Sequence, residues 1–87
     1  MINQSLKNKR IIISAGASGI GLATKKICLA RGAYVYLCDI DSKYLNKLNK
    51  HPLKNKRLFA YLCDASNEYQ VSDFFYKIKK KQKKLML

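Results

Sequence analysis

The sequence lacks any long hydrophobic stretch. No run of about 18 consecutive apolar residues occurs in its 87 residues, so no segment is predicted to cross a membrane. The N-terminal residues 1–10 also lack an apolar segment followed by a small-residue cleavage site, so no secretory signal peptide is predicted. We therefore expect a cytoplasmic protein.

Cysteine is scarce and widely spaced. Cys28, Cys38 and Cys63 form neither an even-numbered disulfide framework nor a Cys-x-x-Cys metal pair. Cys38 and Cys63 are each followed by an aspartate, and a metal site that combines them with His51 is conceivable, but ligand spacing of the usual kind is absent. The better interpretation is that the cysteines are buried as small apolar residues and that there is no metal site.

Acidic residues are few. Five stand against 18 basic residues, which gives a net charge of +13, and such an excess is typical of proteins that bind nucleic acid or an anionic surface. However, 15 of the 18 basic residues are lysine, whereas specific base and phosphate contacts rely on the planar fork of arginine. Six lysines lie within residues 77–84, beside an apolar stripe that favours a solvated helix face. The net charge nevertheless leaves an alternative function open, a small nucleotide- or nucleic-acid-binding module that uses this lysine-rich segment.

Three apolar runs predict β-strands. Residues 10–14 carry three consecutive isoleucines, and a run that is apolar on both faces is typical of a central strand in a parallel sheet. Residues 34–38 predict a second strand, which ends at Asp39, and residues 58–63 predict a third, followed by Asp64. The segments between them have helical patterns, so the order is β-α-β-α-β-α, which indicates parallel strands joined by right-handed crossovers.

Helix boundaries follow from capping residues. The first helix is predicted from Gly19 to about Arg31, where Gly32 ends it. Asp41 is expected to cap a short helix that the His51–Pro52 pair terminates, and Ser66 or Asn67 is expected to open the last helix. The apolar stripes expected to face the core are Ile20, Ala23, Ile27 and Ala30 in the first helix, Tyr44, Leu45 and Leu48 in the second, and Val71, Phe74, Phe75, Ile78 and Leu85 in the third.

The segment between the first strand and the first helix is rich in glycine and other small residues. A strand, a small-residue turn and a helix N-terminus in this order direct free backbone N–H groups and the positive end of the helix dipole at one point. A pyrophosphate binds at such a point without a charged side chain. Gly19 and Gly21 lack a Cβ, which allows the ligand and the neighbouring strand to approach closely.

Asp39 supplies the second half of this signal. It follows Gly21 by 18 residues, at the end of the second predicted strand, where a carboxylate can accept both ribose hydroxyls of an adenosine. The same carboxylate would repel a 2′-phosphate, and Ile40 rather than an arginine comes next, so NAD is predicted over NADP. A simple strand-end aspartate is the other interpretation, which the complete strand–turn–helix–strand context disfavours.

These residues resemble the signatures of the short-chain dehydrogenase/reductase family. Ser14 to Gly21 resembles its Thr-Gly-x-x-x-Gly-Ile-Gly motif, with Ala15 in place of the first glycine, and we expect a slightly altered turn from this change. Asp39 matches the NAD-selecting acid, and Cys63-Asp64-Ala65-Ser66 resembles the Asp-Val-Ser element, which implies that Asp64 contacts the adenine ring. The cofactor-binding residues implied in this way are Ser14, Ala15, Gly16, Ser18, Gly19, Ile20, Gly21, Asp39, Ile40, Asp64 and Ala65.

The resemblance implies a partial Rossmann-like α/β fold, a single incomplete dinucleotide-binding domain over residues 1–87. Its three-stranded parallel sheet is expected in the order 3-2-1, truncated before or at the family's fourth strand. The family's catalytic serine and Tyr-x-x-x-Lys pair match no residue; Tyr76 and Lys80 have the spacing, but in a terminal helix that precedes the fourth strand. We therefore expect an NAD-binding segment of an oxidoreductase that is inactive and marginally stable alone. Its exposed first strand is expected to promote self-association.

Overall fold

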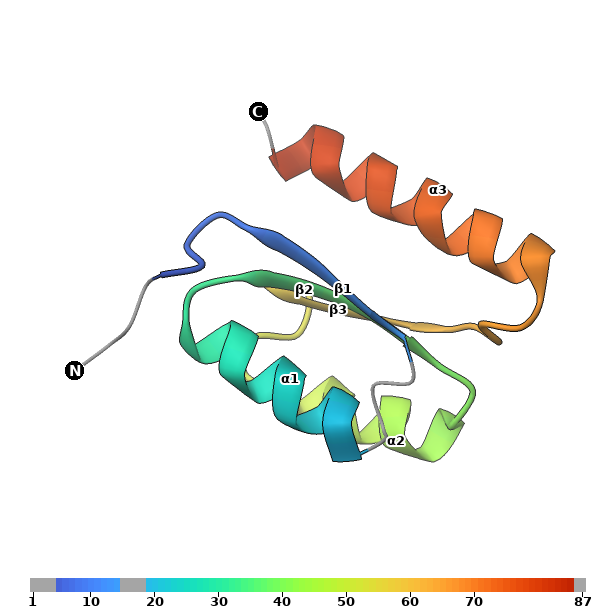
Figure 1. Ribbon diagram of the computed structural model, residues 1–87, viewed down its shortest axis with the longest axis horizontal. Helices are drawn as coiled ribbons and strands as arrows, with labels where there is room; N and C mark the ends of the chain where they lie inside the picture. The colour runs from blue at the N-terminus through green and yellow to red at the C-terminus, as the bar shows by residue number, and fades with distance from the viewer. Residues whose placement is uncertain (1–4, 15–18, 86–87) are drawn as a thin grey trace.

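The computed structural model describes residues 5–14 and 19–85 of the chain (Figure 1). In chain order its elements are β1 (Arg10–Ser14), α1 (Gly19–Ala30), β2 (Tyr34–Asp39), α2 (Ser42–Lys47), the 3₁₀ turn η1 (Leu48–Lys50), β3 (Leu58–Leu62) and α3 (Glu68–Leu85). The predicted alternation of strands and helices is confirmed. The predictions made for Ala15, Gly16 and Ser18 lie outside the described residues.

The three strands form one parallel sheet in the order β1-β2-β3, as predicted. Ile12 pairs with Tyr36, and Tyr36 pairs in turn with Phe59 on the other side. β2 is therefore the central strand, and its residues from Val35 to Asp39 are all buried. β1 lies at an edge of the described sheet and not at the central position that its isoleucine run predicted. The run is buried on one face only, since Ile13 is buried but Ile12 is 45% exposed.

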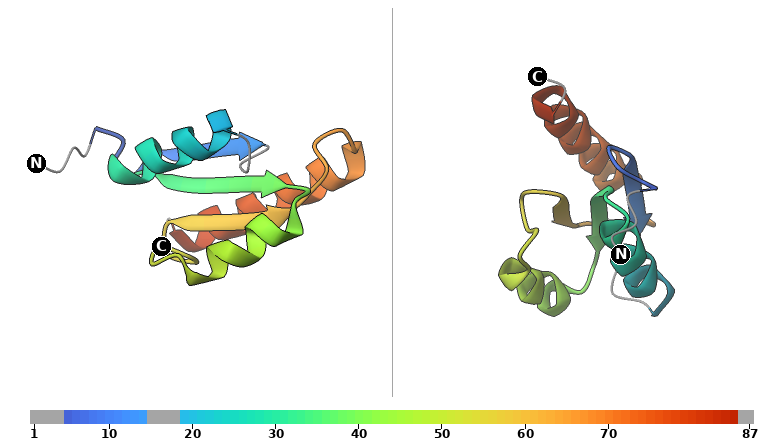
Figure 2. Two further views of the ribbon diagram at one scale, coloured as in Figure 1. Left: turned by 90° about the horizontal axis from the view of Figure 1, so that it is seen from below. Right: turned by 90° about the vertical axis from the view of Figure 1, so that its left-hand side faces the viewer.

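Helices cover both faces of the sheet. α1 and α2 lie on one face and α3 lies alone on the other (Figures 1 and 2). Because side chains alternate along a strand, β2 contributes Val35 and Leu37 to the first face and Tyr36 and Cys38 to the second. The core is consequently divided into an aliphatic cluster beneath α1 and α2 and an aromatic cluster beneath α3.

The predicted helix ends are confirmed. Gly32 has φ 91°, the left-handed conformation that suits glycine after a helix C-terminus. Asp41 Oδ1 accepts hydrogen bonds from the backbone N–H groups of Lys43 (3.0 Å) and Tyr44 (3.2 Å), so it caps α2. Asn67 rather than Ser66 opens α3, because its Oδ1 accepts from the N–H groups two and three residues later.

The predicted inner face of α1 is wrong. Ile20 is 84% exposed and Ile27 is 52% exposed, and the alanines predicted to share their stripe are exposed as well. The buried residues of α1 are instead Gly21, Lys25, Cys28 and Leu29. This face is displaced by one residue, about 100° around the helix axis, from the predicted stripe. It places a glycine and a cysteine toward the sheet, whose small side chains let the helix approach closely.

The last helix follows its prediction more closely. Phe74 and Ile78 are buried and Val71 is half-buried against the aromatic cluster. Phe75, predicted to face inward with them, is 46% exposed, because α3 crosses the sheet without a neighbouring helix beside it (Figure 2).

Candidate functional site

The carboxyl ends of the three strands meet at one edge of the sheet. Ser14 pairs with Cys38, and Asp39 pairs with Leu62, so the last residues of all three strands lie side by side. The backbone N–H of Cys63 also donates to the carbonyl oxygen of Asp39 (3.0 Å), which continues the pairing beyond β3. Ligands of open parallel sheets bind at this edge, outside the carboxyl ends of the strands.

Asp39 is held in a defined position at the end of β2. Its side chain is 8% exposed, and its Oδ1 accepts a hydrogen bond from the backbone N–H of Asp41 (2.8 Å). This local bond turns the chain away from the sheet and into the cap of α2. Because Asp39 follows Val35 and Leu37 at every second position, its side chain lies on the face of the sheet that α1 and α2 cover.

A cavity of about 180 Å³ opens beside Asp39. It is lined by Asp39, Ile40, Cys63, Asp64 and Ala65. Four of these five are residues that the sequence predicted as cofactor contacts, taken from two separate segments. The structure therefore brings together the predicted ribose-binding and adenine-binding residues.

Asp64 is prepared as a hydrogen-bond acceptor. Its Oδ1 accepts from the backbone N–H (2.9 Å) and from the hydroxyl (2.7 Å) of Ser66, and these bonds lower the pKa of the Asp64 carboxyl. The side-chain Oε1 of Gln70 accepts from the backbone N–H of Asp64 (2.8 Å) and ties this loop to α3. Sequence reasoning missed Gln70, since no local pattern links it to a residue six positions earlier.

The glycines at the start of α1 have different surroundings. At Gly19 an added Cβ would meet no described atom within 4 Å, so the space next to this first residue of the helix is open. Gly21 is buried on the face of α1 that packs toward the sheet. Open space at a helix N-terminus is what a phosphate group would occupy, whereas Gly21 serves close helix–sheet packing. Ile20, predicted as a contact between them, projects outward.

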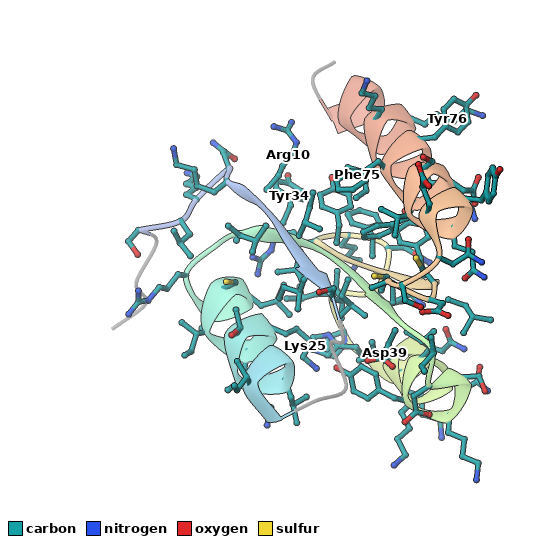
Figure 3. All side chains as sticks on the ribbon, turned by 45° about the vertical axis from the view of Figure 1, so that its right-hand side comes forward. Arg10, Lys25, Tyr34, Asp39, Phe75 and Tyr76 are labelled. Carbon is teal, nitrogen blue, oxygen red and sulfur yellow. The ribbon has the colours of Figure 1, made fainter. Side chains whose placement is uncertain are left out.

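A buried lysine near the site was also missed. Lys25 is 5% exposed, and its Nζ donates a hydrogen bond to the hydroxyl of Tyr44 on α2 (3.2 Å). Burial lowers the pKa of the Lys25 ammonium, and it raises the pKa of the Tyr44 hydroxyl, which the negative charge of Asp39 raises further. Figure 3 shows Lys25 and Asp39 on the same side of the sheet. The predicted apolar stripe placed this lysine off the core face, so no sequence signal revealed its burial.

A second hollow, of about 250 Å³, lies on the opposite face between β1 and α3. Its lining is mostly apolar and consists of Ile12, Ser14, Cys38, Ala65, Val71, Phe74 and Phe75. Ser14, predicted as a cofactor contact, borders this hollow, and Ala65 lines both cavities. The loop that follows β3 therefore borders both cavities.

The Tyr76–Lys80 pair lies away from both cavities. Tyr76 is exposed on α3, and Lys80 Nζ lies 5.0 Å from the centroid of its ring. Figure 3 shows Tyr76 directed away from the sheet. The spacing that resembles a catalytic pair thus places these two side chains on the outer surface of the helix, next to the other described lysines of α3.

Metal and membrane sites have no support in the described part of the chain. All three cysteines are free and buried, as predicted. No group of three or more His, Cys, Asp or Glu side chains within residues 5–14 and 19–85 could hold a metal ion. No described helix is long and apolar enough to span a membrane.

Comparison with known proteins identifies the class of this domain. The family model described as short chain dehydrogenase matches residues 9–87, and the chain therefore belongs to the short-chain dehydrogenase family. Among curated relatives, a tropinone reductase homolog of Arabidopsis thaliana is 34% identical over 67 residues, which cover 76% of this chain and 26% of the relative. Short-chain dehydrogenase reductase 3c of the same plant is 35% identical over 68 residues, or 78% of this chain and 26% of the relative.

A fungal relative has a higher identity over a shorter range. The 5′-hydroxyaverantin dehydrogenase of Dothistroma septosporum is 54% identical over 36 residues, which cover 41% of this chain and 12% of the relative. The chain spans about a quarter of the length of the two plant relatives.

Proposed function

We propose that this chain is the NAD-binding, N-terminal segment of a short-chain dehydrogenase/reductase, a single domain over residues 1–87. The observation that carries the proposal is the meeting of Asp39 and Asp64 at one cavity beyond the carboxyl ends of β2 and β3. Two acidic side chains from separate loops, each oriented by backbone N–H groups of its own segment, suit an uncharged ligand rich in hydroxyl and amino donors. An adenosine has this chemistry.

Each part of the adenosine diphosphate half of NAD has a matching group. The Asp39 carboxylate would accept the two ribose hydroxyls, and the Asp64 carboxylate would accept from the adenine amino group. Ile40, which is exposed at the rim of the cavity, offers an apolar surface to the adenine ring. The open space at Gly19 lies at the N-terminus of α1, where the helix dipole favours a pyrophosphate.

Bound NAD supplies hydride transfer at its nicotinamide ring, and we assign no residue of this chain to that step. The tyrosine and lysine with the family's catalytic spacing lie on the outer surface of α3, away from the site. We therefore propose that the chain holds the adenosine end of the cofactor and is inactive by itself. Purified protein is expected to show no oxidation of NADH with carbonyl substrates, and measurable turnover would contradict this part of the proposal.

The cofactor proposal is tested by calorimetric binding of ADP-ribose. The Asp39→Ala variant is expected to lose at least about tenfold in affinity, because two hydrogen bonds to a charged acceptor disappear. Asp73→Ala is a matched control, since this exposed aspartate lies on α3 and pairs only weakly with Lys77 in an i,i+4 ion pair. Equal affinity of the wild type and Asp39→Ala for ADP-ribose would contradict the proposal.

The nucleic-acid alternative gives the opposite salt response. ADP-ribose binding through hydrogen bonds is expected to change little between about 50 and 200 mM salt. Over the same range, the affinity of a protein for a nucleic-acid phosphate backbone falls by orders of magnitude. Lys77, Lys79 and Lys80, at the start of the charged segment, are exposed on α3, as in a solvated helix face. Tight, steeply salt-dependent binding of a single-stranded oligonucleotide, without ADP-ribose binding, would favour the alternative.

Two further predictions from the sequence concern self-association and cellular location. The open edge of β1 is expected to promote self-association, which sedimentation at increasing protein concentration would detect. The location is predicted to be cytoplasmic, which imaging of a tagged full chain would test.

A further inference from the structure

One edge of the described sheet has no neighbouring strand. β1 pairs with β2 on one side, and no other strand of the described chain lies beyond it (Figure 2). The backbone N–H of Tyr34 donates to the carbonyl oxygen of Lys9 (2.8 Å), so Lys9 directs its carbonyl group toward β2. Because backbone groups alternate along a strand, every second residue of β1 directs its N–H and C=O away from the sheet. These outward residues are Arg10, Ile12 and Ser14.

The opposite edge of the sheet is closed where it begins. The backbone N–H of Leu58, the first residue of β3, donates to the carbonyl oxygen of Leu53 (3.0 Å), and its own carbonyl oxygen accepts from the N–H of Asn55 (2.8 Å). The loop before β3 thus occupies the outer side of this strand, and Leu58 is fully buried. An added strand would have to displace this loop. β1 is therefore the edge at which a further strand can pair without a rearrangement.

The open edge continues into the apolar hollow between β1 and α3. Ile12 and Ser14 line this hollow from the strand, and Phe75 lines it from the helix. Ile12 is 45% exposed and Phe75 is 46% exposed, so covering the hollow would remove apolar surface from water. An occupant of this surface needs an extended backbone that pairs with β1 and apolar side chains that lie against the hollow.

The β1 strand of a second copy of the chain has both properties. It is extended, it carries a run of isoleucines, and the exposed Ile12 is its central residue. Antiparallel pairing about a two-fold axis sets Ile12 opposite its counterpart and Arg10 opposite Ser14 of the second copy, so the two guanidinium groups do not meet. Both α3 helices then lie on the same face of the joined sheet. The two hollows adjoin over the paired isoleucines.

The distribution of charge favours this antiparallel orientation. Lys7, Lys9 and Arg10 lie at the amino end of β1. Acidic residues lie at the opposite end of the molecule, after the strands and at the starts of the next helices, and these are Asp39, Asp41, Asp64 and Glu68. Antiparallel pairing brings the basic end of each copy toward the acidic end of the other, whereas parallel pairing would bring like charges together.

We propose that this chain forms a two-fold homodimer through antiparallel pairing of its β1 strands, which covers the hollows between β1 and α3. The pairing uses the open edge of both copies, so association stops at the dimer. It gives an interface and a stoichiometry to the self-association predicted from the sequence. The cavity beside Asp39 lies beyond the ends of β2 and β3, so the dimer leaves it open and does not depend on cofactor binding.

Sedimentation equilibrium of the full chain measures the dissociation constant of the dimer. About 150 mM salt is suitable, because it screens the repulsion between two basic copies beyond about 8 Å. Ile12→Lys places a charge at the centre of the interface and is expected to raise this constant at least about tenfold.

Ile27→Lys is the matched control. It also replaces an isoleucine by a lysine, at a side chain on α1 that is 52% exposed, and the constant is expected to stay within about twofold of the wild type. If both variants weaken the dimer equally, added charge acts wherever it is placed, and the inference is overturned.

Amide hydrogen exchange locates the interface in the wild type, whether or not the variants fold. The N–H groups of Ile12 and Ser14 are expected to exchange at least about tenfold more slowly in concentrated than in dilute protein, because they are paired only in the dimer. Those of Ile11 and Ile13 pair with β2 in each copy and should already be slow in dilute protein.

Three outcomes in the wild type overturn the inference. One is a protein that stays monomeric up to about 1 mM. Another is protection of the Ile12 N–H that does not depend on concentration, which would assign the edge to another segment of the same chain. The third is growth into larger assemblies, which would show pairing that does not close about a two-fold axis.

Discussion

The two faces of the sheet are built differently. The face under α1 and α2 is aliphatic, and its buried polar side chains are satisfied: Lys25 reaches Tyr44, and Asp39 accepts from the backbone of Asp41. The face under α3 is aromatic, with Tyr36 stacked on Phe59 at a centroid distance of 5.1 Å and Tyr61 edge-on to Phe74 at 5.4 Å. The first face carries the Asp39 carboxylate, whereas the second carries the hollow between β1 and α3.

The α3 face is also the less complete of the two. One helix covers it, and both Ile12 and Phe75 stay about half exposed at the border of the hollow. Among the described residues, the buried hydroxyl of Tyr36 and the buried Nε of Arg10 make no hydrogen bond of good geometry, although the two side chains interact. Burial raises the pKa of Tyr36, although the neighbouring Arg10 guanidinium lowers it in part. The difference teaches that the two acidic residues of the site have different supports: Asp39 is buried at the end of the central strand, whereas the loop of Asp64 is tied to α3 by Gln70.

The largest expected difference between the two faces is in the stability lost when one apolar side chain is removed from each. Leu37 is fully buried in the aliphatic cluster, so Leu37→Ala is expected to lower the free energy of unfolding by about 2–5 kcal/mol, which approaches the whole stability of a small domain. Phe75→Ala removes a half-exposed ring and should cost less than about 1 kcal/mol. Urea denaturation followed by circular dichroism measures both. Equal losses would show that the α3 face is packed as completely as the other.

One tyrosine hydroxyl on each face of the sheet offers a finer comparison. Tyr36→Phe removes a buried hydroxyl that makes no hydrogen bond of good geometry, and should leave the free energy of unfolding unchanged or raise it by up to about 1 kcal/mol. Tyr44→Phe removes the acceptor of the Lys25 ammonium and should lower it by about 1 kcal/mol. The same denaturation experiment distinguishes the signs. A loss of stability in Tyr36→Phe would reveal a partner for its hydroxyl in solution.

The smallest expected effect is a pH dependence on the α1/α2 face. His51 Nδ1 accepts a hydrogen bond from the backbone N–H of Leu53 (3.1 Å), and burial followed by the charge of Lys25 lowers the pKa of His51 from 6.5. The neutral form is therefore favoured in the folded state. Its contribution is present above pH 6.5 and is lost as pH falls through the folded pKa, at a cost of less than about 1 kcal/mol.

The measurement is the urea midpoint at pH 7.5 and at pH 5. The wild type should be less stable at the lower pH, while His51→Asn, which keeps an acceptor but does not titrate in this range, should change less. Identical pH responses in the two proteins would assign the effect to other groups.

Local chemistry made much of this fold predictable. The caps at Asp41 and Asn67 and the left-handed Gly32 act within a few residues of themselves, and the structure places all three as expected. The parallel direction of the strands followed from their alternation with helices, whereas the strand order and the pairing of Asp39 with Asp64 at one site were implied by the family resemblance. The packing face of α1 was not predictable, because its isoleucines point to solvent and a lysine points inward. The spacing of apolar residues predicts which side of a helix is hydrophobic. It does not predict how close the helix must come to its sheet, and in α1 this distance favours the side with Gly21 and Cys28.

The sequence by itself determined the order of strands and helices, their ends, the parallel sheet and the two acidic residues of the site, since each depends on neighbours in the chain or on the pairing of adjacent strands. Only the tertiary structure decided which face of α1 is buried, and with it the burial of Lys25. The physical reason is that close packing selects small side chains at the helix–sheet contact, so Gly21 and Cys28 turn inward and carry Lys25 with them.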